Sequence, residues 1–157
     1  MPQIIVINYG SQVAHLINRR IRELGVFSEL VPYGITSEEI KKINPKGIIL
    51  SGGPASVYER NSPQIEKGIL EMEIPILGVC YGLQLIGKAY GKVISGMIKE
   101  YGRKELFVKG AGKLLKGLGK KEQIWMSHGD LVEKLPDDFN ILAKTDSCPI
   151  AAMENHK

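Results

Sequence analysis

The first 91 residues alternate between short apolar runs and longer segments in which apolar residues recur at helical spacing. The apolar runs lie at 3–8, 26–33, 46–54 and 74–79, and the helical segments at 11–24, 37–43, 62–73 and 82–91. Strands that alternate with helices form a parallel sheet flanked by helices. The sequence therefore predicts an α/β fold in which ligands bind beyond the carboxyl ends of the strands.

The segment 11–24 shows the kind of helix expected on this sheet. Ser11 can accept a hydrogen bond from the first backbone N–H groups, and Gly25 can end the helix. Apolar residues at helical spacing predict one buried face. The residues expected on that face are Val13, Leu16, Ile17, Ile21 and Leu24.

After Gly91 the pattern changes to short strands separated by turns. The predicted strands are 92–98, 104–110, 122–130, 139–146 and 149–155. Additional antiparallel strands are therefore expected in the C-terminal half of the chain. Because no repeat, low-complexity tract or linker divides the sequence, residues 1–157 are predicted to form a single domain.

Composition narrows the class of protein. The chain is 43% hydrophobic and 24% charged, with a net charge of +4, which predicts a globular protein and does not by itself indicate nucleic-acid binding. The basic run 99–121 is either a solvated rim or a docking face for an acidic partner. The first ten residues lack the features of a signal peptide, and no apolar run has the length of a membrane span.

The number and spacing of the cysteines indicate the cellular compartment and the absence of a metal site. The two cysteines, Cys80 and Cys148, form neither a disulfide framework nor a paired metal-ligand spacing. We therefore expect no metal site, and a cytoplasmic location in which thiols stay reduced. Cys148, which is followed by Pro149, is expected to be structural.

Cys80 lies where the fourth predicted strand becomes the fourth helix, in "GVCYG" (78–82). Gly78 and Gly82 permit close backbone approach, as in a nucleophile elbow, where a sharp turn exposes the nucleophile. A helix that begins near Tyr81 lowers the pKa of such a thiol through its dipole and N–H groups. The alternative is a buried structural cysteine. The flanking glycines favour the nucleophile.

Two other segments place small or polar residues at predicted strand ends. In "LSGGP" (50–54), Gly52 and Gly53 expose backbone N–H groups that, with the N–H of Tyr81, can stabilise an oxyanion; a plain tight turn is the alternative. In "WMSHGD" (125–130), a serine, a histidine and an aspartate follow an apolar strand. That segment either lines a pocket or forms a capped turn.

Together these motifs resemble those of class I glutamine amidotransferases. The combination of "INYGSQ", "LSGGP", "GVCYGLQ", "WMSHGD" and "SCPIAAMEN" is most similar to the amidotransferase part of GMP synthetases, over nearly all 157 residues. The resemblance implies a flavodoxin-like α/β domain that hydrolyses glutamine to glutamate and ammonia through a thioester on a cysteine. The combination is specific, whereas each motif alone is weak.

The resemblance also implies a role for each matching residue. Cys80 would be the nucleophile, and Gly53 and Tyr81 would donate oxyanion-hole hydrogen bonds. Glutamine would be bound by Gln84, Ser127, Gly129 and Asp130. No cofactor is implied for this chain, because ATP and Mg²⁺ would belong to a separate ATP-pyrophosphatase partner that aminates XMP to GMP. The sequence contains no P-loop and no dinucleotide-binding motif.

One feature departs from the family. The His-Pro-Glu stretch that activates the cysteine in this family is absent from the sequence, so these 157 residues alone are expected to have poor glutaminase activity. Of the three histidines, His15 lies on the first helix and His156 precedes the last residue. His128 is the remaining local base, but the family pattern places it in a substrate-side loop.

Three alternative functions remain open on the sequence. The chain can be a class I amidotransferase that serves another synthase. It can be a non-catalytic docking or regulatory subunit, since the His-Pro-Glu stretch is missing. It can also be a cysteine hydrolase unrelated to glutamine, in which case Cys80 would not react with an electrophile that mimics glutamine.

Overall fold

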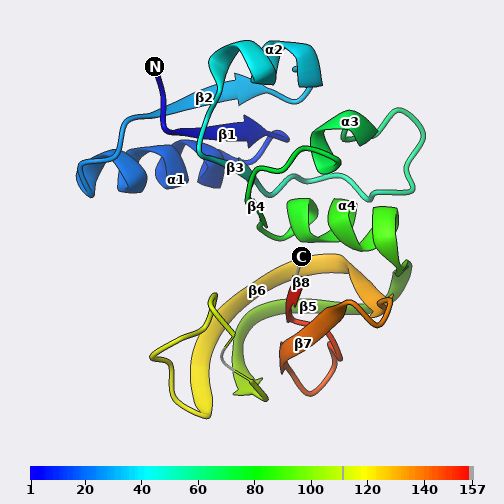
Figure 1. Cartoon of the computed structure of the whole chain (residues 1–157). Coiled ribbons are helices and arrows are strands. Elements are labelled where there is room, and N and C mark those ends of the chain that lie inside the picture. The colour runs from blue at the N-terminus through cyan, green and yellow to red at the C-terminus, as the bar shows by residue number, and fades with distance from the viewer. Residues whose placement is uncertain (111, 156–157) are drawn as a thin grey trace. The chain divides into compact units, whose positions relative to one another are not determined.

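The computed structural model describes residues 1–110 and 112–155, with the backbone alone for 96–98 (Figure 1). The chain forms two compact units, Met1–Leu85 and Ile86–Lys157. His156, which the sequence analysis set aside as a base, lies outside the described residues. The two units are described in turn.

The first unit contains a four-stranded parallel sheet with the order β2-β1-β3-β4. Its elements are β1 (Ile4–Asn8), α1 (Gln12–Glu23), β2 (Ser28–Pro32), α2 (Ser37–Ile43), β3 (Gly47–Leu50), α3 (Lys67–Leu70) and β4 (Ile76–Gly78). Strands β1 and β3 lie at the centre, and their side chains, such as Ile5, Ile7 and Leu50, are fully buried. The short β-branched runs form these strands because both faces of a parallel sheet are covered.

Helices α1 and α2 cover opposite faces of this sheet (Figure 1). The order β2-β1-β3 requires this arrangement, since the chain moves one way from β1 to β2 and the other way from β2 to β3, and each crossover is right-handed. Ser11 caps α1 as predicted, accepting a bond from the Val13 N–H at 3.1 Å.

The predicted buried face of α1 was right for Ile17 and Ile21, which are half-buried, and wrong for the other three residues. Val13, Leu16 and Leu24 are 46%, 57% and 82% exposed, whereas Ala14 is fully buried. Asn18 explains the shift, because its carbonyl and side-chain oxygens both accept hydrogen bonds from the Ser28 hydroxyl, at 3.1 and 2.7 Å. This anchor turns the face that contains positions 14 and 18 toward β2, so that the predicted apolar residues flank the contact.

Helix α3 is also shorter than the predicted helix 62–73. Glu66 precedes it without capping it, because the Glu66 carboxylate accepts bonds from the N–H and hydroxyl of Ser37, at 2.8 and 2.7 Å. Ser37 is the first residue of α2. A side chain that the sequence assigned to one helix therefore satisfies the N-terminus of another.

The second unit contains an antiparallel sheet with the order β6-β5-β7-β8. It follows α4 (Tyr81–Tyr90), and its strands are β5 (Lys92–Val108), β6 (Lys121–Lys134), β7 (Phe139–Lys144) and β8 (Ala152–Asn155). Strands β5 and β6 form a long curved ribbon (Figure 1). The predicted strands 92–98 and 104–110 are thus one strand, with an irregular register between Ser95 and Glu100. No helix in the described residues is both long and apolar enough to cross a membrane.

Candidate active site

The site begins at Cys80, between the end of β4 and the start of α4. Its φ angle is 53°, in the left-handed region that non-glycine residues rarely occupy, and its side chain is exposed. The Gln84 N–H donates to the Cys80 carbonyl at 3.0 Å, so the helical hydrogen bonds start at this residue. The strained, exposed thiol at a helix N-terminus agrees with the predicted nucleophile elbow.

Two glycines make this turn possible. A Cβ on Gly78 would lie 2.6 Å from the Gly82 carbonyl, and a Cβ on Gly82 would collide with the Leu50 carbonyl oxygen. The Gly82 N–H also donates to the Ser51 carbonyl at 3.1 Å, which holds the start of α4 against the end of β3. Both glycines of "GVCYG" are therefore required by close backbone contact.

The glycine pair that follows β3 lies beside the elbow. A Cβ on Gly52 would sit 3.6 Å from the Cβ of Cys80, and one on Gly53 would sit 2.5 Å from the Tyr9 carbonyl oxygen. Ser51, which the sequence analysis did not single out, fixes this segment: its buried hydroxyl accepts from the Tyr9 N–H at 3.0 Å and donates to the Gly52 carbonyl at 2.9 Å. Its position at a strand end before two glycines was the available signal.

Tyr81 and Gln84, both on α4, are 1% and 6% exposed. The Tyr81 hydroxyl donates to the Pro63 carbonyl at 2.6 Å, so its side chain anchors the loop that leads to α3. The Tyr81 ring also packs against Tyr9, with ring centroids 5.5 Å apart. This anchoring leaves the backbone of Tyr81, not its phenol, as the group that can serve Cys80.

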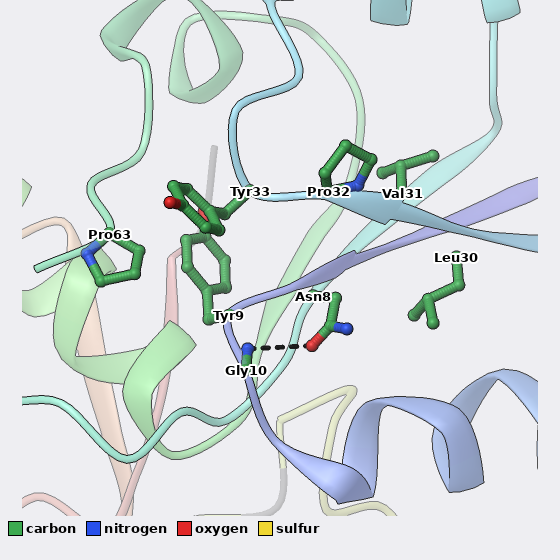
Figure 2. A pocket seen from close by; sticks show the side chains of 8 residues that line it. All are labelled: Asn8, Tyr9, Gly10, Leu30, Val31, Pro32, Tyr33 and Pro63. Carbon is green, nitrogen blue, oxygen red and sulfur yellow. Dashed lines mark hydrogen bonds between the residues drawn. The ribbon is translucent and has the colours of Figure 1, made fainter.

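A cavity of about 500 Å³ lies at the carboxyl ends of β1 and β2 (Figure 2). Its walls include Asn8, Tyr9, Tyr33 and Pro63, but not Cys80. The Tyr9 hydroxyl is buried and forms no hydrogen bond within the described part of the chain. Its burial raises its pKa, and the nearby Tyr81 adds to this effect. Tyr9 thus lines this cavity and also packs against Tyr81, the residue that follows Cys80.

The remaining predicted site residues belong to the second unit. Ser127, Gly129 and Asp130 lie within β6, where Ser127 is exposed and Asp130 is 5% exposed. The predicted strand 122–130 is confirmed as part of β6, and the alternative of a capped turn at "WMSHGD" was wrong, because this segment pairs with β5 and the strand continues to Lys134. His128 is held within the second unit by a 3.0 Å bond between its Nε2 and the Glu100 carboxylate.

A parallel α/β sheet with an exposed, strained cysteine at a strand-to-helix turn defines a class of flavodoxin-like proteins in which this position suits a nucleophile. Comparison with known sequences narrows this class: residues 5–157 match the family described as "Glutamine amidotransferase class-I". The chain belongs to the class I glutamine amidotransferase family.

Its sequence relatives include GMP synthases named as glutamine-hydrolysing. The chain is 49% identical over 153 residues to one from Caldanaerobacter subterraneus and 50% identical over 151 residues to one from Bacillus subtilis. These matches cover 97% and 96% of this chain but 30% and 29% of the relatives. The chain thus spans less than a third of the relatives' length.

Solved structures agree on the fold. A protein from Thermoplasma acidophilum, provisionally described as one subunit of a GMP synthase, superposes with a TM-score of 0.91 at 31% identity, covering 100% of this chain and 79% of that one. A glutamine amidotransferase from Thermotoga maritima gives a TM-score of 0.76 at 18% identity, covering 97% of this chain and 70% of that one. The predicted class I amidotransferase fold, with a parallel sheet and additional antiparallel strands, is confirmed.

Proposed function

We propose that this chain is the glutamine-hydrolysing component of GMP synthesis, with Cys80 as its nucleophile. The observation that carries this proposal is the thiol itself: exposed, at a φ of 53°, and at the N-terminus of α4. A structural cysteine has no need of that backbone strain. Strain of this kind is found where a side chain must be presented to a substrate.

The reaction proceeds in two steps. The Cys80 sulfur attacks the side-chain amide carbon of glutamine, the carbon–nitrogen bond breaks, and the nitrogen leaves as ammonia once it has received a proton. Water then attacks the γ-glutamyl thioester, which releases glutamate and restores the thiol. A general base must take the thiol proton and return it to the leaving nitrogen. In the family this is the task of the His-Pro-Glu stretch, which is absent from these 157 residues.

The reaction also requires that negative charge on the substrate oxygen be stabilised, and the backbone around Cys80 is assigned this task. Both transition states carry negative charge on the former amide oxygen, and the N–H groups of Gly53 and Tyr81 are assigned to it. The placement of Gly52 against Cys80 and of Gly53 against the Tyr81 ring supports this assignment. Each such donor contributes about 3 kcal/mol to the transition state. Gln84, Ser127, Gly129 and Asp130 are assigned to glutamine binding.

Ammonia passes from this chain to an ATP-pyrophosphatase component, which uses it to convert XMP to GMP. The support is the family of the relatives, GMP synthases in which the matched segment is 30% or less of the chain. ATP and Mg²⁺ belong to that component, and the reaction takes place in the cytoplasm. Whether the component is a separate subunit or part of a longer chain is decided by the reading frame around this sequence.

Glutamate release and GMP formation test the proposal. The protein as encoded, combined with its ATP-pyrophosphatase component, is supplied with glutamine, XMP and ATP. Cys80→Ala is expected to abolish glutamine-dependent GMP formation and to leave ammonia-dependent formation intact. Glu71→Ala is the control, because it removes only an exposed ion pair with Lys67. Equal glutamine-dependent rates for Cys80→Ala and the unaltered protein would favour a docking subunit.

Covalent labelling separates the remaining alternatives. A chloroketone analogue of glutamine is expected to alkylate Cys80 and to be blocked by excess glutamine, with the modified peptide identified by mass spectrometry. Failure to label, with hydrolysis of another amide or ester, would indicate a cysteine hydrolase unrelated to glutamine. Glutamine-dependent activity with a different acceptor in place of XMP would indicate another synthase of the same class.

A further inference from the structure

The second unit buries a cluster of metal-ligating side chains that the glutaminase chemistry does not use. Glu100 on β5 and His128 on β6 are opposite one another in the strand register. Cys148 follows β7. Glu100 and Cys148 are 1% and 3% exposed, and the His128 side chain is 9% exposed. Three segments that are distant in the sequence thus bring these side chains together in a largely buried cluster.

The three side chains offer a carboxylate oxygen, an imidazole nitrogen and a thiol sulfur, all within 4.8 Å of one another. Zinc binds such atoms at about 2.0–2.3 Å, so neighbouring ligand atoms in a tetrahedral site lie about 3.3–3.8 Å apart. The Glu100 Oε2 to His128 Nε2 distance is 3.0 Å. To hold an ion, these two atoms must move apart by about 0.3 Å, and ligand atoms near the 4.8 Å limit must approach by about 1 Å.

Hydrogen bonds already orient the Glu100 carboxylate. Its other oxygen, Oε1, accepts from the hydroxyls of Thr145 and Ser147, at 2.6 and 2.5 Å. The Thr145 hydroxyl also accepts from the Cys148 N–H at 2.9 Å, which fixes the backbone that carries the thiol. Hydrogen bonds of this kind, one layer outside the ligands, orient the ligands of protein metal sites.

One atom of the cluster is left without a hydrogen bond. His128 Nδ1 is buried and has no hydrogen-bond partner among the described residues. Buried polar atoms are rarely left in this state, because the lost hydration is not repaid. The described residues therefore satisfy only one nitrogen of this imidazole, and an ion held by this cluster would bind that nitrogen, Nε2, beside Glu100 Oε2.

We propose that Glu100, His128 and Cys148 form a structural zinc site, with a water molecule as fourth ligand. The mixture of oxygen, nitrogen and sulfur donors suits Zn²⁺ better than Mg²⁺ or Ca²⁺, which prefer oxygen alone. Binding would tie the segment after β7 to the β5–β6 ribbon. The sequence spacing gave no sign of the site, because its ligands come from three separate segments.

Zinc binding displaces one proton. The Cys148 sulfur now contacts the Ile150 carbonyl at 3.4 Å as a weak S–H donor, and burial raises the pKa of this thiol to about 11. When the sulfur binds the ion, that contact breaks and the thiol proton leaves to solvent. The charge of the ion is then partly offset by the thiolate and the Glu100 carboxylate.

Cobalt substitution tests the site directly. The protein as encoded is stripped of metal with a chelator and titrated with Co²⁺, which reports a bound thiolate through a sulfur-to-cobalt charge-transfer band. We expect one equivalent of Co²⁺ to produce the band and one equivalent of Zn²⁺ to remove it. Zn²⁺ is also expected to raise the thermal unfolding midpoint. Absence of the band and of stoichiometric zinc from the unaltered protein would overturn the proposal.

Two cysteine variants assign the thiolate. Cys148→Ser is expected to lose the band and to weaken Zn²⁺ binding at least about 100-fold, whereas Cys80→Ala keeps both. Loss of the band in Cys80→Ala and its retention in Cys148→Ser would place the metal at the exposed thiol and refute the site. If Cys148→Ser does not fold, as judged by circular dichroism, Thr145→Val is used, with about 10–100-fold weaker binding expected; unchanged binding in that variant would refute the site. None of these measurements depends on glutaminase activity.

Discussion

At the scale of single residues, the backbone conformation of Cys80 lowers the stability of the fold. A non-glycine residue in a left-handed conformation costs on the order of 1 kcal/mol, and Cys80 carries this cost at a φ of 53°. Its place beyond β4 was predictable, since the flanking glycines marked the turn. The fixing role of Ser51 was not predictable, because its partners, Tyr9 and Gly52, meet it only when β1 and β3 pair.

Glycine at position 80 is therefore expected to be better tolerated by the fold than alanine. Cys80→Gly removes the strain, whereas Cys80→Ala keeps it, so the glycine variant should have the higher free energy of unfolding, by about 0.5–1 kcal/mol. Both variants should lack glutamine hydrolysis. Urea denaturation of the two proteins measures the difference. The usual order, with alanine more stable than glycine, would show that position 80 is unstrained in solution.

A methyl group at Gly82 is expected to damage the elbow. A Cβ there collides with the Leu50 carbonyl oxygen, which belongs to the central strand β3 and cannot move aside. Gly82→Ala should lower the free energy of unfolding by about 2–4 kcal/mol and reduce glutamine hydrolysis with it. Gly34→Ala in the same unit is the control, because nothing lies within 4 Å of its Cβ position. Equal stabilities of the two variants would contradict the crowding argument.

At the scale of elements, local signals predicted the order of helices and strands in the first unit and the start of α2, but not what these elements contact. The Thr36–Glu39 capping box fixes the start of α2, which spans the predicted residues 37–43. The buried face of α1 was only partly right because the Asn18–Ser28 contact depends on β2. The capped turn that was one alternative at "WMSHGD" was wrong because pairing with β5 extends the strand through these residues. Such errors arise where tertiary partners outweigh local preference.

Glu66 provides a test of one such tertiary contact. Its carboxylate satisfies the N-terminus of α2 through the N–H and hydroxyl of Ser37. Glu66→Ala should therefore lower the free energy of unfolding by about 1–2 kcal/mol, since it leaves these two donors without their charged acceptor. Glu71→Ala, which removes an exposed ion pair with Lys67, should change it by less than about 0.5 kcal/mol. Comparable losses would mean that Glu66 acts only as a surface charge.

At the scale of the whole molecule, the family match runs through both compact units of the chain. Residues 5–157 match the amidotransferase family continuously, whereas the chain forms two compact units. The nucleophile and its glycines lie in the first unit, and the residues assigned to glutamine on the strength of the resemblance include Asp130 in the second. The catalytic assignment therefore predicts that a variant in the second unit alters glutamine kinetics.

Asp130→Asn tests this prediction. It keeps the size of the side chain and removes its charge. If Asp130 binds the amino group of glutamine, the KM for glutamine should rise about 10–100-fold with a smaller change in kcat, because a charged hydrogen bond is worth about 1.5–3 kcal/mol in the bound state. Glu133→Gln is the control on the same strand, because Glu133 pairs with Lys92 at the surface. An unchanged KM together with reduced stability would assign Asp130 to the interior of the second unit and remove it from the glutamine site.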